Sequence, residues 1–358
     1  MRANDEPAVL KVALDAQQTV GTATGIGEYV RGLLGALPEA GIEPIPLRVT
    51  SFDPWRFDRR VVWDQALLPL AALRSGAALL HCTSGSLPVA SPLPVVATVH
   101  DLAWARAQEH APFYARWYFG RFSARRWNGA RAVIVDSAFT RDELLATSSL
   151  EPERIVVVHP GVDRAFGLVA RNPDPAAVLL AVGTVERRKN VAVVIAALAE
   201  LEGARLVCVG PRTPYQDECL ALARRLGVSE RVAFPGYVGR DELLALYARS
   251  SIAVVPSRYE GFGYGAAQAL CAGIPLVAAR TSSLVEVVGD DAPLLSPDDS
   301  AAWALACREI LANREEAERR AAATRARALV RFSWEASAAA TASVYRTALA
   351  NRRAFAAG

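Results

Sequence analysis

The stretch that decides the fold is residues 257–272, SRYEGFGYGAAQALCA. An apolar run at 252–256 leads into it, so the pattern predicts a buried strand, a Gly-Phe-Gly turn and a helix of small residues from about Tyr264. A strand, a glycine turn and a helix N-terminus together form a site for phosphate, because backbone N–H groups and the helix dipole point toward the ligand. Glu260, beside this turn, would repel phosphate but can accept hydrogen bonds from neutral hydroxyls. The stretch therefore indicates a sugar attached to a nucleoside diphosphate.

Length and composition set broad limits on the class of protein. The 358 residues favour two domains of ordinary size, and 52% apolar with 22% charged residues is typical of a globular chain. A net charge of +3 is too small to indicate nucleic acid as a partner. No apolar run is long enough to span a membrane, and the N-terminal residues lack the apolar region of a signal peptide. We therefore expect a cytoplasmic protein.

The cysteines and lysines are also informative. Five cysteines are scattered with no C-x-x-C pair, which argues against a zinc site and against a disulfide framework. Only two of the 40 basic residues are lysines, Lys11 and Lys189. Lys189 stands among arginines in the run 186–190, ERRKN, so we interpret it as a position that needs a compact point charge.

Short apolar runs alternate with helix-length spacers along the chain, as in parallel sheets flanked by helices. A polar stretch with two prolines at 171–175 predicts a linker between two such series, and an alanine-rich helix is expected at 334–350. The predicted strands are 9–14, 78–80, 95–99, 133–135 and 155–158 in the first series, and 178–182, 205–209, 232–234, 252–256 and 275–279 in the second.

Polar residues follow several of these strands, at the sheet edge where parallel sheets bind ligands. His100 and Asp101 come directly after the strand at 95–99, while His81 and Asp136 follow two other strands. His100 is the strongest candidate to reach a ligand. A structural histidine with both ring nitrogens in hydrogen bonds is the alternative.

A second glycine-rich loop, at 19–27, follows the first predicted strand and precedes a helix at 26–37. This is again the phosphate-binding arrangement of strand, loop and helix. The G-x-G-x-x-G fingerprint is absent, which argues against a nicotinamide-dependent dehydrogenase. For Gly25 and Gly27 the alternative is a tight turn alone.

Aromatic and basic residues alternate between positions 104 and 131. One interpretation is a face for a membrane surface or a phosphorylated acceptor. The other, which we favour, is an ordinary amphipathic helix with aromatic side chains inward and arginines in water.

Eight motifs in order along the chain resemble a family 4 retaining glycosyltransferase of the GT-B fold, and the TVERRKN part of the fifth motif is similar to its mannosyltransferase-like branch. The resemblance implies an α/β protein with two Rossmann-like domains facing across a cleft. They would be an acceptor-binding domain at 1–170 and a nucleotide-sugar-binding domain at 171–333, with the helix at 334–358 packing back on the first. The motifs are TGIGEYVRGLL, TVHDLAW, VDSAFTRDEL, VVHPGVD, VGTVERRKN, FPGYVGRDELLALY, PSRYEGFGYGAAQALCAGIPLVA and SSLVEVVGDDA.

The resemblance also implies roles for single residues. His100 would lie near the reacting sugar, Glu260 would hold sugar hydroxyls, and Lys189 would hold the diphosphate. The remaining donor-binding positions would be Gly25 and Gly27 in the first domain, and Arg188, Tyr237, Val238, Phe262, Gly263, Tyr264 and Gln268 in the second. Glu286 matches a family acid to which we assign no chemical role.

Gln268 departs from the family pattern, in which a glutamate stands eight positions after Glu260 and accepts hydrogen bonds from the ribose. A glutamine keeps one acceptor oxygen, but it is neutral and adds two donors. The departure could weaken nucleotide binding by about 1–2 kcal/mol. It suggests tolerance of a different ribose, such as a deoxyribose.

The function that these inferences predict is transfer of a hexose from a nucleotide-diphosphate sugar to an acceptor hydroxyl, with retention of configuration. Arg188 and Lys189 would neutralise the leaving diphosphate, and no D-x-D triplet is present, so we expect neither a metal nor another cofactor. The donor would be a GDP-mannose-like or UDP-sugar, and the acceptor a glycan, a lipid-linked molecule or a small natural product. The alternative is a nucleotide-sugar-binding protein with little turnover because of Gln268. A phosphorylase is disfavoured, since neither lysine is suitably placed for a pyridoxal cofactor.

Overall fold

The computed structural model describes residues 9–21, 25–51, 56–103 and 116–350, without the side chains of Arg116 and Phe119. The chain forms two compact domains. The first comprises Met1–Gly161 together with Trp334–Gly358, and the second comprises Val162–Ser333. Each domain is described by itself.

The boundary between the domains lies nine residues before the position expected from the linker at 171–175. The reason is packing. The Val162 N–H donates to the Phe332 carbonyl at 2.8 Å, and Phe166 packs edge-on against Tyr247, with ring centroids 5.2 Å apart. Residues 162–170 therefore belong to the second domain, and the proline-rich stretch lies within it.

The first domain contains a six-stranded sheet with the order β2-β1-β3-β4-β5-β6, and every pairing in it is parallel. Strand β2 was not predicted, because Pro44 and Pro46 interrupt its sequence. It lies at the edge of the sheet, where proline is tolerated. The strands are β1 (Leu10–Asp15), β2 (Ile42–Leu47), β3 (Leu79–Cys82), β4 (Val95–Val99), β5 (Ala132–Val135) and β6 (Ile155–Val157).

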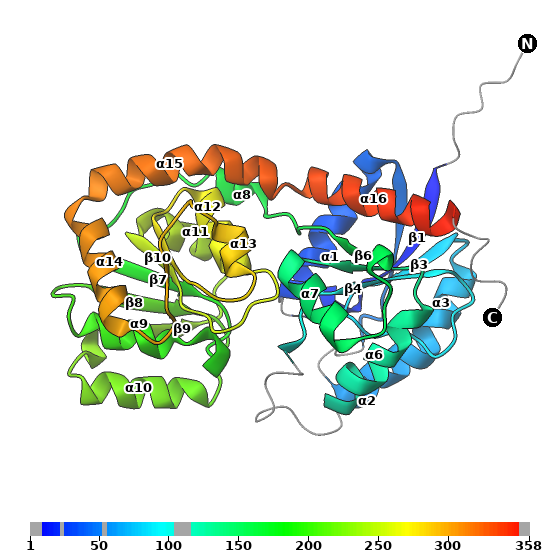
Figure 1. The fold of residues 1–358 in the computed structure, drawn as a ribbon, viewed down its shortest axis with the longest axis horizontal. Coiled ribbons are helices and arrows are strands. Elements are labelled where there is room, and N and C mark those ends of the chain that lie inside the picture. The colour runs from blue at the N-terminus through cyan, green and yellow to red at the C-terminus, as the bar shows by residue number, and fades with distance from the viewer. Residues whose placement is uncertain (1–8, 22–24, 52–55, 104–115, 351–358) are drawn as a thin grey trace, which may run out of the picture. The chain divides into compact units, whose positions relative to one another are not determined.

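Both faces of this sheet are buried, and alternate strand residues point to opposite faces. Val12 and Leu14 pack with Tyr29 of α1 (Gly25–Ala36) and Tyr345 of α16 (Trp334–Ala350). Ala13 packs on the other face, where α3 (Leu68–Arg74) and α7 (Ala138–Thr147) contribute. Helices α1 and α16 lie side by side (Figure 1). The last helix thus completes the core of the first domain.

The second domain also contains a six-stranded parallel sheet, with the order β12-β11-β10-β7-β8-β9. Helix α14 packs beside α9, and α15 packs beside α12 (Figure 1). The strands are β7 (Val178–Val182), β8 (Arg205–Val209), β9 (Val232–Gly236), β10 (Ile252–Val255), β11 (Leu276–Ala279) and β12 (Leu294–Leu295). The main helices are α9 (Val191–Leu198), α10 (Tyr215–Arg225), α11 (Arg240–Arg249), α12 (Tyr264–Ala272), α13 (Leu284–Val288), α14 (Ser300–Ala312) and α15 (Arg314–Arg331).

Shorter elements complete the described parts of the chain. They are α2 (Phe57–Val62), α6 (Ser123–Arg126) and α8 (Arg164–Gly167), two π-helical segments, η3 (Trp63–Leu67) and η4 (Arg116–Phe122), and the 3-10 turns η1 (Gln17–Thr19), η2 (Leu37–Ala40), η5 (Trp127–Gly129), η6 (Pro152–Arg154), η7 (Arg187–Lys189) and η8 (Ser229–Arg231). No helix in the described ranges is both long and apolar enough to cross a membrane.

The prediction of two parallel α/β sheets in succession is confirmed. The cleft expected between the two domains stays a prediction.

Candidate functional site

The candidate site lies where the strand order of the second sheet reverses. The chain adds β8 and β9 on one side of β7, and then returns to add β10 on the other side. Parallel sheets bind ligands in the crevice beyond the carboxyl ends of the two strands at such a switch point. The loop after β7 carries Lys189, and the loop after β10 carries Glu260.

Lys189 and Glu260 are in direct contact. The Lys189 Nζ donates to both carboxylate oxygens of Glu260, at 2.6 and 2.9 Å. The carboxylate is buried, whereas the lysine side chain keeps a fifth of its surface exposed. Because an ammonium group has three N–H donors and the acid takes two, the lysine retains a donor for a ligand.

Arg188 lies beside this pair and brings a second cation to the site. Its Nη1 is 3.4 Å from a Glu260 oxygen and donates to the Tyr259 carbonyl at 3.3 Å, while its Nε is 2.8 Å from a Glu186 oxygen. The sequence prediction named Arg188 and Lys189 but missed Glu186. Two cations and two acids thus meet at the end of β7, and Glu260 is the most buried of the four.

Glu260 is held in place at its backbone as well as its side chain. Ser257 donates to its Oε1 at 2.7 Å, its N–H donates to the Ser282 Oγ at 2.9 Å, and Ser283 donates to its carbonyl at 2.9 Å. Burial alone would raise the pKa of Glu260, but the charges of Lys189 and Arg188 and the side-chain hydrogen bonds from Lys189 and Ser257 bring it below its usual value. Glu260 is therefore an ionised acceptor at neutral pH.

The turn after Glu260 requires glycine. Gly263 has φ +97°, and a Cβ there would lie 2.7 Å from Leu284 Cδ2. Helix α12 begins directly after it, and a Cβ at Gly265 would come 3.3 Å from the Val182 carbonyl oxygen, so the first turn of α12 packs against the end of β7. Phe262, Gly263 and Tyr264 thus lie at a helix N-terminus beside Lys189 and Glu260, as predicted from the sequence. A helix N-terminus in this position favours an anion.

The loops after β7 and β10 are tied together by hydrogen bonds to backbone carbonyls. Asn190, with φ +52°, donates from Nδ2 to the Pro256 carbonyl at 3.2 Å and to the Pro297 carbonyl at 2.7 Å. The Arg258 N–H donates to the Arg188 carbonyl at 2.7 Å. These bonds hold Lys189 and Glu260 at a set separation before any ligand binds. The sequence signal for Asn190 was a residue that tolerates positive φ at the end of the ERRKN run.

The ends of β8 and β9 continue the same edge of the sheet. A Cβ at Gly210 would lie 2.0 Å from the Gly183 carbonyl oxygen, so the loops after β7 and β8 touch through their backbones. Tyr237, just after β9, is 55% exposed, whereas the Val238 side chain is buried in the core. Tyr237 can therefore offer a ring to a ligand, and Val238 only its main chain.

Gln268 faces a partner that the sequence analysis did not foresee. The Tyr247 hydroxyl donates to the Gln268 Oε1 at 3.3 Å. The oxygen keeps a second lone pair, so it and the amide NH₂ both remain to meet a ligand. Tyr247 is buried, so it fixes the orientation of this amide.

His100, in the first domain, has both ring nitrogens engaged. Its Nδ1 is 2.7 Å from the Asp136 Oδ2, and its Nε2 is 2.8 Å from the Thr83 carbonyl oxygen. A carbonyl only accepts, so Nε2 carries a proton, and the carboxylate favours a second proton on Nδ1. Burial alone would lower the pKa of His100, but Asp136 raises it above its ordinary value. The described geometry matches the structural alternative, and a catalytic role for the ring stays a prediction.

The other candidates in the first domain also have structural partners. His81 lies within β3, not beyond it. Its two nitrogens contact Tyr345 and Thr98 at 2.7 Å each, and burial lowers its pKa to about 3. Gly25 begins α1, and a Cβ at Gly27 would come 2.7 Å from the Gln18 carbonyl oxygen. Close approach of helix and loop thus requires Gly27, and contact of either glycine with phosphate stays a prediction.

The amphipathic stretch expected between 104 and 131 is described only from residue 116 onward. There Tyr118 and Trp127 are buried, as the amphipathic-helix interpretation requires, but Trp117 is 49% exposed. In the described parts of the chain, no three or more His, Cys, Asp or Glu side chains are grouped so that they could hold a metal ion.

Two family descriptions match the chain, one in each half. Glycosyl transferases group 1 matches residues 169–327, and Glycosyltransferase Family 4 matches residues 23–166. The chain belongs to these glycosyltransferases. The resemblance inferred from the motifs is thereby confirmed, and the group 1 match covers the Lys189–Glu260 site.

Among curated proteins, glycogen synthase from Mycobacterium tuberculosis is 34% identical over 276 residues, which are 73% of this chain and 65% of that protein. The chain thus spans about two thirds of the length of this relative. Among solved structures, sucrose-phosphate synthase from Thermosynechococcus elongatus aligns with a TM-score of 0.77 at 22% identity, over 95% of this chain and 99% of that one. HepE from Anabaena, in complex with UDP-glucose, aligns with a TM-score of 0.74 at 17% identity, over 94% and 99%. These structures are GT-B glycosyltransferases and share the fold.

Proposed function

We propose that the protein transfers a hexose from a nucleotide-diphosphate sugar to a hydroxyl of an acceptor, with retention of the anomeric configuration and without a metal ion. The observation that carries this proposal is the contact of Lys189 and Glu260 at the switch point of the second sheet. A nucleotide sugar offers each member of this pair a partner. Diphosphate oxygens can bind Lys189 and Arg188, and sugar hydroxyls can donate to Glu260.

The ion pair also explains how the site exists without its ligand. Two cations at a partly buried helix N-terminus would be costly without a counter-ion, and Glu260 supplies one. When the diphosphate binds, its charge can take over part of this role, and Glu260 gains acceptor capacity for the sugar. The same cations then stabilise the charge that grows on the departing diphosphate.

Retention follows if the acceptor oxygen attacks the anomeric carbon from the face of the leaving group. The bond between that carbon and the phosphate oxygen breaks, the new glycosidic bond forms, and the acceptor proton passes to the departing phosphate oxygen. The products are a glycoside and a nucleoside diphosphate. No carboxylate nucleophile is needed in this reaction, in agreement with the use of Glu260 as a partner of lysine.

UDP-glucose is the first donor to test, since HepE in complex with UDP-glucose shares the fold, and GDP-mannose is the second. Oligosaccharides of glucose are the first acceptors, because one relative is named glycogen synthase. Lipid-linked and small natural-product acceptors complete the panel.

The experiment is calorimetry with UDP and GDP, followed by donor turnover with each acceptor in the presence and absence of EDTA. We expect one nucleotide to bind, its sugar donor to be consumed equally with and without EDTA, and NMR to show the donor's anomeric configuration in the product. Absence of binding by both nucleotides would refute the donor site. Binding without turnover across the panel would instead favour a nucleotide-sugar-binding protein, and inversion or loss of turnover with EDTA would refute those parts of the mechanism.

A further inference from the structure

The proposed donor site contains as many acids as cations. Arg188 and Lys189 bring two positive charges, and Glu186 and Glu260 bring two negative charges. Glu260 has a second use in the proposed transfer, because it can accept hydrogen bonds from sugar hydroxyls. No step of that reaction uses Glu186, although its carboxylate oxygen lies 2.8 Å from the Arg188 Nε. This second acid therefore needs a role of its own.

Glu186 begins the short turn that carries both cations. It is the N-cap of η7, and its carbonyl accepts the Lys189 N–H at 2.9 Å. A 3-10 turn has three residues per turn, so the side chains of Arg187, Arg188 and Lys189 point in three different directions. Arg188 and Lys189 both reach Glu260. The Glu186 carboxylate thus lies at the edge of the cation pair.

Arg187, in the same turn, has a counter-ion outside the site. Its Nη2 donates to the Glu218 Oε1 of α10 at 2.6 Å, and its guanidinium carbon lies 5.6 Å from the centre of the Tyr215 ring. The two side chains of this ion pair are 54% and 49% exposed. Since Arg187 is balanced by Glu218, the charge of Glu186 acts on the donor site.

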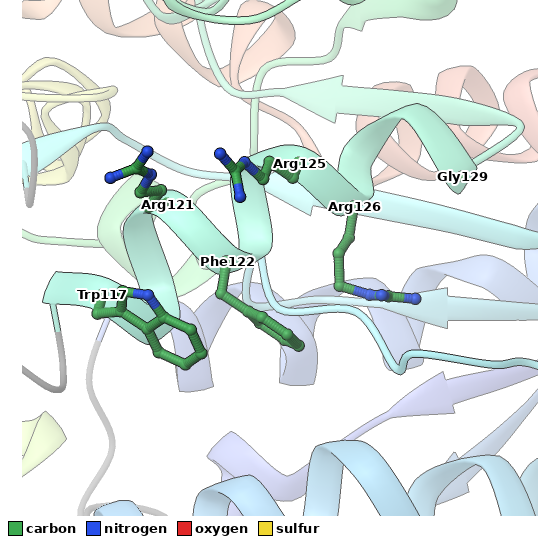
Figure 2. Close-up of a pocket in the computed structure, with 6 residues that line it drawn as sticks. All are labelled: Trp117, Arg121, Phe122, Arg125, Arg126 and Gly129. Atoms are coloured by element: carbon green, nitrogen blue, oxygen red, sulfur yellow. The ribbon is translucent and has the colours of Figure 1, made fainter.

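Pairing with an acid is not a general property of the arginines in this arginine-rich chain. A pocket of about 380 Å³ in the first domain is lined by three arginines, and none of the described residues that line it is acidic. The guanidinium groups of Arg121 and Arg125 lie there on the opposite side of the helix from the Trp117 ring (Figure 2). A second acid beside Arg188 is therefore a particular feature of the donor site.

We propose that Glu186 weakens the hold of the site on the nucleoside diphosphate product more than its hold on the sugar donor. This role of Glu186 rests on the proposed function. In the donor, one oxygen of the terminal phosphate is bonded to the sugar. In the product this oxygen has received the acceptor proton, which it then releases to water. Because the second pKa of a terminal phosphate is about 6, the product carries nearly one more negative charge than the donor at pH 7.5.

The additional charge on the product makes the repulsion by Glu186 selective. A carboxylate repels the product more strongly than the donor, and since the Glu186 side chain is only 35% exposed, solvent screens this repulsion incompletely. A site with the same two cations and one acid would bind both nucleotides more tightly and would retain the product longest. Glu186 thus lowers donor affinity slightly and favours release of the diphosphate.

The variant Glu186→Gln separates the charge from the position of the side chain. The glutamine keeps one acceptor oxygen for the Arg188 Nε. Arg188 also keeps the Tyr259 carbonyl at 3.3 Å and the Glu260 oxygen at 3.4 Å, so it stays in the site when the charge is removed. Glu186→Asp retains the charge. Glu218→Gln is the matched control, because it removes an acid that pairs with the neighbouring arginine outside the site.

Calorimetry measures the binding of UDP and GDP to each variant, and of UDP-glucose and GDP-mannose in the absence of an acceptor. Glu186→Gln should bind the diphosphate about threefold to tenfold more tightly than the unmodified chain does, because a like charge is removed from a partly exposed position. Its affinity for the corresponding sugar donor should rise by a smaller factor. Both gains should shrink in about 0.5 M NaCl, whereas a purely structural effect would persist. Glu186→Asp and Glu218→Gln should bind as the unmodified chain does.

In turnover, inhibition by the diphosphate product should become stronger in Glu186→Gln by the same factor as its binding. Glu186 has no such role if Glu186→Gln binds the diphosphate no more tightly than the unmodified chain, if donor and product gain equally, or if Glu218→Gln gives the same gain. Failure of both UDP and GDP to bind the unmodified chain would instead refute the donor site, and the role of Glu186 with it.

Discussion

The polar clusters at the strand ends of the two domains differ in the donors that they leave for a ligand. In the second domain, Lys189 gives two hydrogen bonds to Glu260 and keeps a third donor, and Arg188 is 29% exposed. In the first domain, His100 uses both of its ring nitrogens on Asp136 and Thr83. We call the Lys189–Arg188–Glu260 group the open cluster, because it keeps hydrogen-bond donors for an anion. We call the His100–Asp136 group the closed cluster, because both ring nitrogens of its histidine are already hydrogen-bonded.

This difference follows from how each cluster balances its charge. A histidine ring has two nitrogens, so one acid and one carbonyl exhaust it. Lysine and arginine have more donors than the nearby acids can accept, so part of their capacity faces solvent. A strand-end position alone therefore does not identify a ligand site. The number of donors left after internal pairing distinguishes the two clusters.

The largest expected effect tests the open cluster. Lys189→Ala should lower kcat of transfer by about 10²-fold or more, because it removes a preorganised charge that stabilises the leaving diphosphate. Lys11→Ala is the matched control, since it removes the chain's other lysine, which lies on the surface 3.4 Å from Glu43. Steady-state kinetics of nucleoside diphosphate release measures both. Turnover near that of the unmodified chain in Lys189→Ala would remove this lysine from the mechanism.

The next effect tests whether the closed cluster is structural. His100→Gln should lower the free energy of unfolding by about 1.5–3 kcal/mol at pH 6, because a neutral amide replaces a charged hydrogen-bonded ring. The raised pKa of His100 adds stability that is fully present below the ordinary value of 6.5 and is lost as the pH rises through the raised pKa. Stability should therefore fall above pH 6.5 in the unmodified chain, and less so in the variant.

Hydrogen exchange of the β3–β5 amides localises this effect to the first domain. His81 provides an internal contrast, because its lowered pKa of about 3 makes the fold lose stability as the pH falls below 6.5. The two histidines therefore act in separate pH ranges. An identical pH slope above 6.5 in the His100→Gln variant and the unmodified chain would contradict the closed-cluster assignment.

Much of the difference between the two clusters could be predicted from the sequence. The part that could not be predicted depends on which strands are neighbours in the sheet. Lys189 and Glu260 were predicted to act together, because each follows a strand at a glycine-rich loop. The His100–Asp136 bond was not predicted, although both residues were placed at strand ends. The sequence does not say that β4 and β5 are neighbours, and this neighbourhood brings residues 36 positions apart into contact.

Local sequence patterns also left part of the fold unpredicted. Apolar runs predicted ten of the strands. Strand β2 was missed because Pro44 and Pro46 interrupt its apolar pattern, and β12 was missed because it has only two residues. The contact between Tyr247 and Gln268 joins two helices, α11 and α12, and no local pattern records it. Local chemistry thus selected the candidate residues, and tertiary packing decided which of them pair.

A smaller effect sharpens the description of the open cluster. Gln268→Glu should tighten UDP binding by about 1–2 kcal/mol, because a carboxylate makes charge-assisted bonds to the ribose hydroxyls that the amide cannot make. Calorimetry with UDP and deoxy-UDP measures it. The variant should increase the preference for the ribonucleotide. A strong preference for ribose in the unmodified chain would contradict the proposed tolerance of a deoxyribose.

The smallest expected effect separates packing from phosphate binding at the first domain's glycine loop. Gly27→Ala should destabilise the fold by about 1 kcal/mol, because its Cβ would lie 2.7 Å from the Gln18 carbonyl oxygen, a backbone atom that cannot move easily. Gly35→Ala, in the same helix, meets nothing within 4 Å and should stabilise the fold by about 0.5–1 kcal/mol. Urea unfolding measures both variants.

Transfer activity then decides between the two interpretations of this loop. If Gly27→Ala keeps kcat/KM at a temperature where it is fully folded, the glycine serves only the close approach of α1 to the loop after β1. If kcat/KM falls while UDP still binds the second domain, the loop contacts the donor in the reaction, as the family resemblance implies. In that case the closed His100 cluster would have an open neighbour in its own domain, and the contrast between the two domains would apply to their charged clusters alone.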